Sequence, residues 1–288
     1  FAVGSSVKGA TLLTGYQNHT IKVGEEMIDE PLHFRGGLTK RSYFNQNGKV
    51  LINDKEALMH SSNVYMFKTA LRLAGDPYSS GMSLPNNIEE AGQKLRKGLN
   101  QVGLGVKTGI DLPNETIGQI EPLTNNPGNY LDLSIGQYDT YTPIQLSQYI
   151  STIANNGYRV QPHIGLAIHD ATNSDQVGPV KDKTKGNILN KVNNSQDEID
   201  EVKQGFKMAF NEKDGTGYAS FHKTVVPSAG KTGTAEVYQN GQSRVNSTYI
   251  GYAPIKDPKL AFSIVYTNQP VPPPWLNGGD LGRDIINY

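Results

Sequence analysis

Apolar residues recur at helical spacing in several stretches of the chain. Within residues 194–211, Ile199, Val202, Phe206 and Phe210 fall on one face of a helix. Similar spacing, combined with helix-capping residues, predicts further helices earlier in the sequence. These are residues 5–17, 54–75, 86–103 and 142–157.

The helix predicted for residues 54–75 is interrupted by polar residues. Ser61, Ser62 and Asn63 favour turns over helix interiors, because their side chains compete for backbone hydrogen bonds. Ser61 and Asn63 are alternate residues, so both side chains can face one cleft. The sequence therefore predicts two helices with a break at these three residues.

β-branched and aromatic runs gather near the end of the chain. Turn residues such as Asn240-Gly241 and Lys256-Asp257-Pro258 separate three of these runs, which predicts an antiparallel meander. The runs are residues 228–239, 247–255 and 259–269, with short outlying strands expected at 18–23 and 48–53 and a polar loop at 170–187. Helices before an antiparallel meander indicate an α+β layered fold.

The composition then excludes several functional classes. The 288 residues suffice for one large domain or two small ones with a sizeable buried core. The 27 basic and 27 acidic residues cancel, which argues against nucleic-acid binding and against a polybasic membrane patch. The six histidines are scattered without ligand spacing and cysteine is absent, so we expect neither a metal site nor a cofactor. There is no run of about 18 apolar residues to indicate a transmembrane helix.

Gly230, Lys231 and Thr232 match the end of a phosphate-binding loop, whose full pattern is G-x-x-x-x-G-K-[ST]. Val225 stands where that pattern needs its first glycine, and a β-branched residue resists the positive φ that glycine supplies. The residues after the motif do not have the pattern of the long helix that such a loop opens. Lys231 therefore needs another explanation.

Three short motifs carry candidate chemistry, and their order is that of penicillin-binding proteins and serine β-lactamases. They are Ser5-Ser6-Val7-Lys8 (S-x-x-K), Ser61-Ser62-Asn63 (S-x-N) and Lys231-Thr232-Gly233-Thr234 (K-T-G-T). Each motif is weak alone, because Ser5 also suits a helix cap, and Ser61 and Asn63 suit an ordinary turn. Together, in this order and in fitting structural contexts, the motifs outweigh the three separate explanations.

Structural context selects among the copies of the first motif, since S-x-x-K occurs at Ser5, Ser220 and Ser228. Ser5 and Lys8 lie three residues apart on a predicted helix, which places them on one face with β-carbons about 5–6 Å apart. Free N–H groups in the first helical turn would also stabilise negative charge at Ser5. Ser228 precedes a strand, where positions three apart point to opposite faces, and Ser220 lies between a glycine-rich loop and a strand.

Context also selects between the two copies of K-T-G. Lys231 leads directly into a predicted strand, and Gly233 leaves room for a ligand to lie against the edge of that strand. Lys107 instead leads into a turn and has no threonine after its glycine. We therefore interpret Lys107 as part of an ordinary loop.

Beyond the motifs, the chain resembles the transpeptidase domain of class B high-molecular-weight penicillin-binding proteins, most of all the type 2B enzymes of Gram-positive cocci. The similar stretches are GSSVKG, GVKTGIDLPNE, LSIGQYDTYTPIQLSQYISTIANNG, GTGYASF and STYIGYAPI, and the resemblance covers essentially all 288 residues. It implies the penicillin-binding and β-lactamase-like fold, an antiparallel sheet flanked by helices with an all-α lobe.

The same resemblance implies that residues 1–288 form a partial D,D-transpeptidase domain, truncated at both ends. Family domains carry a helix and strands before the nucleophile, whereas here the nucleophile would be the fifth residue. The missing strands would leave the edge of the 259–268 strand open. The residues at the C-terminus look like a helix cut short.

The resemblance implies specific roles for the motif residues. Ser5 would be the acylated nucleophile, and Lys8 would take its proton, which requires a neutral amine. Ser61, helped by Lys231, would relay the proton to the leaving amine. Asn63 would bind the amide backbone of the substrate.

The third motif would hold the rest of the substrate. Thr232 and Thr234 would bind its terminal carboxylate, and the strand edge at Gly233 would pair with its backbone. The N–H groups of Ser5 and Thr234 would form the oxyanion hole.

The implied reaction is acyl transfer from D-Ala-D-Ala stem peptides of peptidoglycan to an amine of a neighbouring stem peptide, which β-lactam antibiotics block by acylating Ser5. The alternatives are a D,D-carboxypeptidase or β-lactamase, which would use water as acceptor, and a non-catalytic β-lactam sensor. The resemblance also implies that the domain works at the outer face of the cytoplasmic membrane, with its anchor outside this fragment. There the full-length parent would contact other cell-wall synthesis proteins.

Overall fold

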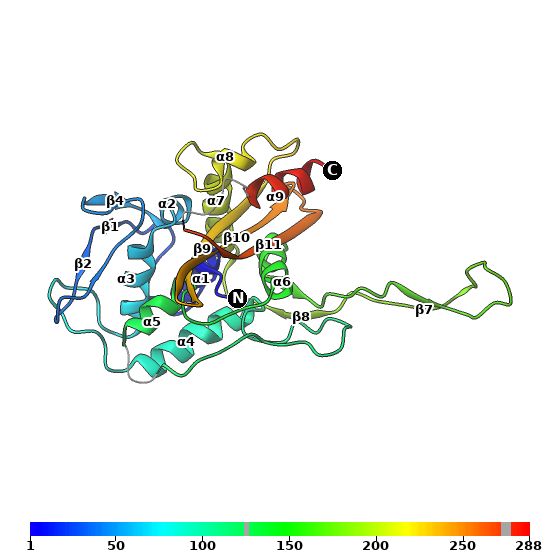
Figure 1. Cartoon of the computed structure of the whole chain (residues 1–288), viewed down its shortest axis with the longest axis horizontal. Coiled ribbons are helices and arrows are strands. Elements are labelled where there is room, and N and C mark those ends of the chain that lie inside the picture. The colour runs from blue at the N-terminus through cyan, green and yellow to red at the C-terminus, as the bar shows by residue number, and fades with distance from the viewer. Residues whose placement is uncertain (124–126, 272–277) are drawn as a thin grey trace.

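The computed structural model describes residues 1–123, 127–271 and 278–288, and a three-stranded antiparallel sheet lies at its centre (Figure 1). The strands, in the order β11-β10-β9, are β9 (Ala229–Gln239), β10 (Gln242–Ala253) and β11 (Leu260–Gln269). The predicted meander is confirmed, although β10 begins earlier than expected. Asn240 and Gly241 both have positive φ, as in the tight hairpin turns that let two strands pair up to their ends.

Helices cover both faces of this sheet. Alternation along β10 places Ile250 and Tyr252 in the main core, and places Tyr249 against a second cluster that includes Phe262. The covering helices are α1 (Lys8–Gln17), α6 (Pro143–Ala154) and α7 (Gln196–Asn211) at the main core, and α8 (Tyr218–Phe221) and α9 (Gly278–Asn287) at the second cluster. This layering confirms the predicted α+β class. Within the described part of the chain, β11 pairs with β10 alone.

A helical lobe packs beside α1. It contains α2 (Asp54–Met59), α3 (Asn63–Leu73), α4 (Ile88–Gln101) and α5 (Pro127–Leu133), as Figure 1 shows. The predicted break is confirmed, because α2 ends before it, α3 begins at Asn63, and Ser61 between them has a φ of 59°. α5 was not expected from the sequence, since Gly128 and Asn129 are poor helix formers. In the structure, burial of Tyr130, Leu131 and Leu133 favours the helix.

Two-stranded ribbons complete the fold of the described residues. They pair β1 (Met27–Asp29) with β4 (Val50–Ile52), β2 (Leu32–His33) with β3 (Thr39–Lys40), β5 (Tyr158–Val160) with β8 (Ile188–Lys191), and β6 (Ala167–His169) with β7 (Val180–Lys183). β4 confirms the strand expected at 48–53. The strand expected at 18–23 is wrong, because the chain turns there with His19 at a φ of 53°. The loop expected at 170–187 contains β7, which projects from the body together with β6 (Figure 1).

Candidate active site

Ser5 lies in a single 3-10 turn, η1 (Gly4–Val7), that leads directly into α1. The sequence predicted an α-helical turn here, and the tighter turn still keeps residues three apart on one face. The Ser5 side chain is partly exposed, and its hydroxyl has no hydrogen-bond partner among the residues that the structure describes. The hydroxyl is therefore free to approach a substrate.

The turn that carries Ser5 is pressed against the third motif. A β-carbon added to Gly233 would lie 2.3 Å from the carbonyl oxygen of Val3 and 3.4 Å from the backbone nitrogen of Ser5. A β-carbon added to Gly4, which has a φ of 56°, would lie 2.3 Å from the carbonyl oxygen of Thr234. Only glycine fits at both positions, so the sequence fixes the approach of η1 to β9.

Lys8 joins the first motif to the second. Its side chain is fully buried, and its Nζ donates to the carbonyl oxygen of Ser61 at 2.7 Å and to Asn63 Oδ1 at 2.7 Å. Nζ also lies 3.2 Å from the Ser61 hydroxyl. The structure therefore brings Lys8, Ser61 and Asn63 together. The sequence predicted that Lys8 reaches the Ser5 hydroxyl, whereas in the structure Nζ bonds to the second motif.

The positive φ of Ser61 explains this arrangement. A non-glycine residue in the left-handed region is uncommon and costs backbone energy. Here that conformation turns the carbonyl of Ser61 and its hydroxyl toward the same amine. The hydroxyl can accept a hydrogen bond from an ammonium group or donate one to a neutral amine, so it is suited to pass a proton.

Burial lowers the pKa of both lysines in the motifs. For Lys8, burial is the main cause, the like charge of Lys231 lowers the pKa further, and the Asp29 carboxylate acts in the opposite direction. Burial lowers the pKa of Lys231 to about 7. A lysine that loses its proton near neutral pH can act as a general base, which an ordinary surface lysine cannot.

The third motif lies on β9, at the edge of the sheet. Gly233 is paired with Thr248 of β10, and the outer side of β9 has no strand partner among the described residues. Lys231 is fully buried and donates to the carbonyl oxygen of Thr232 at 2.9 Å, whereas Thr234 is exposed. The predicted strand edge is therefore present beside Ser5.

Thr216 is a neighbour of this site that the sequence reasoning did not single out. The Thr232 hydroxyl donates to the Thr216 hydroxyl at 2.7 Å, and the Thr216 N–H donates to the carbonyl oxygen of Met59 at the end of α2. The loop before α8 thus links the third motif to the end of α2, which lies two residues before Ser61. In the sequence, Thr216 was noted only as part of the GTGYASF stretch, one of the stretches similar to the family, and no role was assigned to it.

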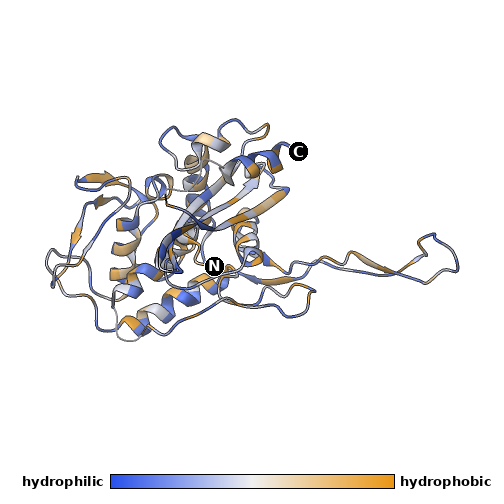
Figure 2. Cartoon of the chain, viewed as in Figure 1, coloured by the Kyte–Doolittle hydropathy of each residue, from blue (hydrophilic) through white to orange (hydrophobic). Residues whose placement is uncertain are grey.

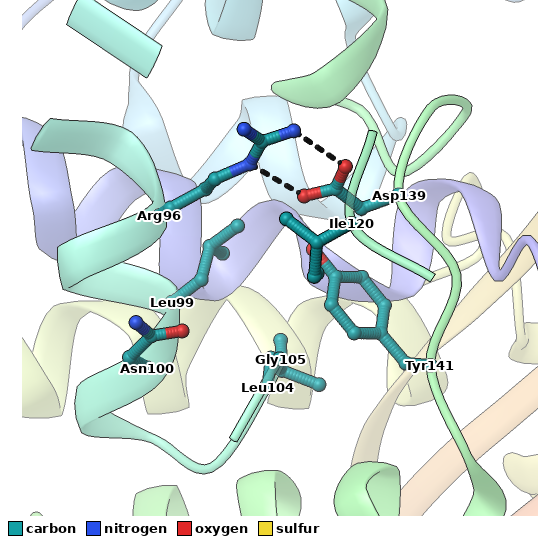
Figure 3. Close-up of a pocket in the computed structure, with 8 residues that line it drawn as sticks. All are labelled: Arg96, Leu99, Asn100, Leu104, Gly105, Ile120, Asp139 and Tyr141. Atoms are coloured by element: carbon teal, nitrogen blue, oxygen red, sulfur yellow. Dashed lines mark hydrogen bonds and ion pairs between the residues drawn. The ribbon is translucent and has the colours of Figure 1, made fainter. Parts of the chain in front are cut away.

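A small pocket elsewhere in the molecule is separate from the motifs. It has a volume of about 70 Å³ and lies where Arg96 of α4 forms a two-pronged ion pair with Asp139 (Figure 3). No residue of the three motifs lines it. In the described ranges, no cluster of three histidine, cysteine or acidic side chains could hold a metal ion, and no helix is long and apolar enough to cross a membrane.

Comparison with known proteins tests whether the motifs and fold indicate a family. Residues 1–280 match the family model of the penicillin-binding protein transpeptidase domain. The chain belongs to this transpeptidase family. The predicted resemblance is therefore confirmed, including its similarity to class B proteins of Gram-positive bacteria.

Individual members of the transpeptidase family show how far the similarity extends. Penicillin-binding protein H of Bacillus subtilis is 46% identical over 273 residues, which cover 92% of this chain and 37% of that protein. Penicillin-binding protein 2B of Streptococcus pneumoniae is 37% identical over 100% of this chain and 43% of that protein. The chain thus spans less than half of the length of these relatives.

A solved structure from the transpeptidase family confirms the fold. Penicillin-binding protein 2B of Streptococcus pneumoniae strain R6 aligns with a TM-score of 0.93 at 37% identity, covering 100% of this chain and 47% of that one. Penicillin-binding protein 2 of Helicobacter pylori, at 26% identity, aligns with a TM-score of 0.71.

Proposed function

We propose that the chain is the catalytic part of a serine D,D-transpeptidase that cross-links peptidoglycan and is acylated by β-lactams. The observation that carries this proposal is the Lys8 amine, which is buried and held by Ser61 and Asn63 at the base of the turn that bears Ser5. Membership of the transpeptidase family supports the same reaction.

In the acylation step, the Ser5 oxygen attacks the carbonyl carbon of the D-Ala-D-Ala peptide bond. Neutral Lys8 takes the hydroxyl proton, and the N–H groups of Ser5 and Thr234 stabilise the oxyanion of the tetrahedral intermediate. The intermediate collapses to an ester on Ser5 and expels D-alanine. The leaving amine receives its proton through the Ser61 hydroxyl, with Lys231 assisting.

The substrate would lie along the outer edge of β9 as an added strand. Thr232 and Thr234 would bind the terminal carboxylate by their hydroxyls, close to the buried Lys231 amine. Asn63 would bind the amide of the peptide on the opposite side. These contacts place the scissile carbonyl at Ser5, and such positioning accounts for a large part of enzymatic rate enhancement.

In the second step, an amine from a neighbouring stem peptide attacks the ester and forms the cross-link. A β-lactam opens on Ser5 in the same way, but its ring fragment stays attached and blocks the acceptor. The E-x-x-x-N pattern, which could activate water, occurs between Ser61 and Lys231 at residues 121–125. Its Glu121 is exposed, and the backbone oxygen of Glu121 accepts from Arg96 beside the small pocket that no motif residue lines. We therefore favour transfer to an amine over hydrolysis by a carboxypeptidase or β-lactamase.

We further propose that the parent protein works at the outer face of the cytoplasmic membrane together with other cell-wall synthesis proteins. Penicillin-binding protein 2 of Helicobacter pylori, at 26% identity, has been solved in complex with MreC. That relative supports a partner of the same kind here.

Turnover of a donor peptide tests the reaction. With a stem-peptide donor ending in D-Ala-D-Ala and an amine acceptor, we expect released D-alanine and an amide-linked product, both detected by mass spectrometry. Ser5→Ala should form neither product. A hydrolysed donor without the amide product would indicate a carboxypeptidase, and stable acylation by penicillin without any donor turnover would indicate a sensor.

A further inference from the structure

Asp29, the last residue of β1, is a buried carboxylate behind the second motif, with 1% of its surface exposed. Its Oδ2 accepts hydrogen bonds from the hydroxyls of Ser42 at 2.6 Å and Ser62 at 2.5 Å. The side-chain amide of Asn45 donates to Oδ1 at 3.1 Å and to the backbone oxygen of Asp29 at 2.7 Å. Three segments that are distant in sequence therefore meet at one carboxylate.

Ser42 and Ser62 in turn satisfy the start of α3. Ser42 Oγ accepts from the backbone N–H groups of Asn63 at 3.0 Å and Val64 at 3.1 Å, and Ser62 Oγ accepts from that of Tyr65 at 2.9 Å. The first four N–H groups of a helix have no intrahelical partner, and at α3 these two oxygens accept hydrogen bonds from three of the four. Because both hydroxyls donate to the carboxylate, their oxygens are oriented toward the helix.

The same carboxylate acts on the charge of Lys8. The charged groups that act on the Lys8 amine are Lys231 from β9 and Asp29 from β1, whereas Ser61 and Asn63 on the α2–α3 side are uncharged. Lys231 lowers the pKa of Lys8, and Asp29 raises it. A buried negative charge at the N-terminal end of a helix is also stabilised by the helix dipole.

We propose that Asp29 is a positioning residue of the acyl-transfer site, an inference that rests on the function proposed above. Through two serine hydroxyls its carboxylate fixes the first turn of α3, and with it the Ser61 and Asn63 groups that hold Lys8. Its charge also offsets the positive charge of the buried Lys8 amine. Both the place and the protonation of the general base thus depend on a residue outside the three motifs.

The test is the pH profile of acylation by benzylpenicillin, followed by intact-protein mass. Asp29→Asn keeps the shape and an acceptor oxygen but removes the charge, so the pKa of Lys8 should fall. Because the neutral amine is the base, the acid-side midpoint of the acylation rate should move about one pH unit lower. If the substitution only disturbed the structure, the acylation rate would fall at every pH and this midpoint would not move.

Ser42→Ala separates position from charge. This variant keeps the carboxylate but removes the acceptor for the N–H groups of Asn63 and Val64. The acylation rate should fall by about 10-fold to 100-fold at every pH, since small displacements of catalytic groups have effects of this size. The midpoint of its profile should stay at the wild-type value.

Asp139→Asn is the matched control. Asp139 is also a carboxylate with 1% of its surface exposed, but it is bound to Arg96, and its charge is not among those that act on Lys8. This variant should keep the wild-type midpoint.

An unmoved midpoint in Asp29→Asn would overturn the proposal, as would a wild-type acylation rate in Ser42→Ala. If Asp29→Asn does not fold, the Ser42→Ala rate decides alone. Failure of the unchanged, folded protein to form any adduct would instead contradict the proposed function, and the inference would fall with it.

Discussion

At the residue scale, the site is defined by two buried lysines, Lys8 and Lys231, whose amines are not in direct ion pairs among the described residues. Among the described residues, no acidic side chain lies within ion-pair distance of the amines of Lys8 or Lys231, and both side chains have no exposed surface. Burial of an isolated ammonium group is costly, and lysines respond by losing the proton. The energetic cost of burial thus produces the neutral amine that the proposed mechanism needs.

The buried amine of Lys231 should make stability depend on pH. Its folded pKa, about 7, lies below the ordinary value of 10.5, so between these values the unfolded state binds more protons. The free energy of unfolding should therefore rise with pH across this window, by up to about 1.4 kcal/mol per pH unit. Lys231→Met removes the part of this pH dependence that comes from the Lys231 amine.

Denaturant unfolding at pH 7, 8 and 9 measures the effect. The stability of the wild-type protein should increase relative to Lys231→Met over this series, and the variant should be the more stable protein at pH 7. Two curves that stay parallel from pH 7 to pH 9 would mean that Lys231 keeps its proton in the folded state.

At the scale of single elements, the sequence predicted those features whose causes are local. The break before α3 followed from Ser61, Ser62 and Asn63, because their side chains favour turns wherever they occur. The β9–β10 hairpin followed from Asn240-Gly241 for the same reason. The contact of Lys8 with the second motif was not predicted, because it depends on how α1 packs beside the α2–α3 turn.

What the sequence did not predict are the contacts between distant segments. The N-terminus of α3 is fixed by Asp29 and Ser42, which precede it by more than twenty residues and form no recognisable motif. Thr216 joins the site through one hydrogen bond from Thr232. The role of each of these single residues depends on a partner that is distant in sequence. No periodicity or motif spacing in the sequence could therefore predict it.

At the scale of the whole molecule, the candidate active site and the projecting ribbon are separate parts. The site forms where η1, the α2–α3 turn and β9 meet, although these lie far apart in sequence. The β6–β7 ribbon extends away from this body (Figure 1), and Figure 2 shows apolar residues along it. Ile164, Leu166 and Ile168 at its base are 63%, 71% and 63% exposed.

Shortening the ribbon should therefore leave the body intact. None of residues 168–182 is buried, and Ala167 is paired with Lys183 across the two strands. Replacement of residues 168–182 by Asn-Gly should close the ribbon in a tight turn. The unfolding temperature and the rate of acylation by benzylpenicillin should stay at their wild-type values, and a loss in either would mean that the ribbon supports the site.

The central claim is that Ser5 is the acylated nucleophile, and intact-protein mass after incubation with benzylpenicillin tests it most directly. We predict a stable adduct of one drug mass on the wild-type protein, no adduct on Ser5→Ala, and an unchanged adduct on Ser220→Ala, which alters another copy of the S-x-x-K motif. Circular dichroism confirms that each protein is folded. A folded wild-type protein without an adduct, or an adduct that persists in Ser5→Ala, would contradict the account.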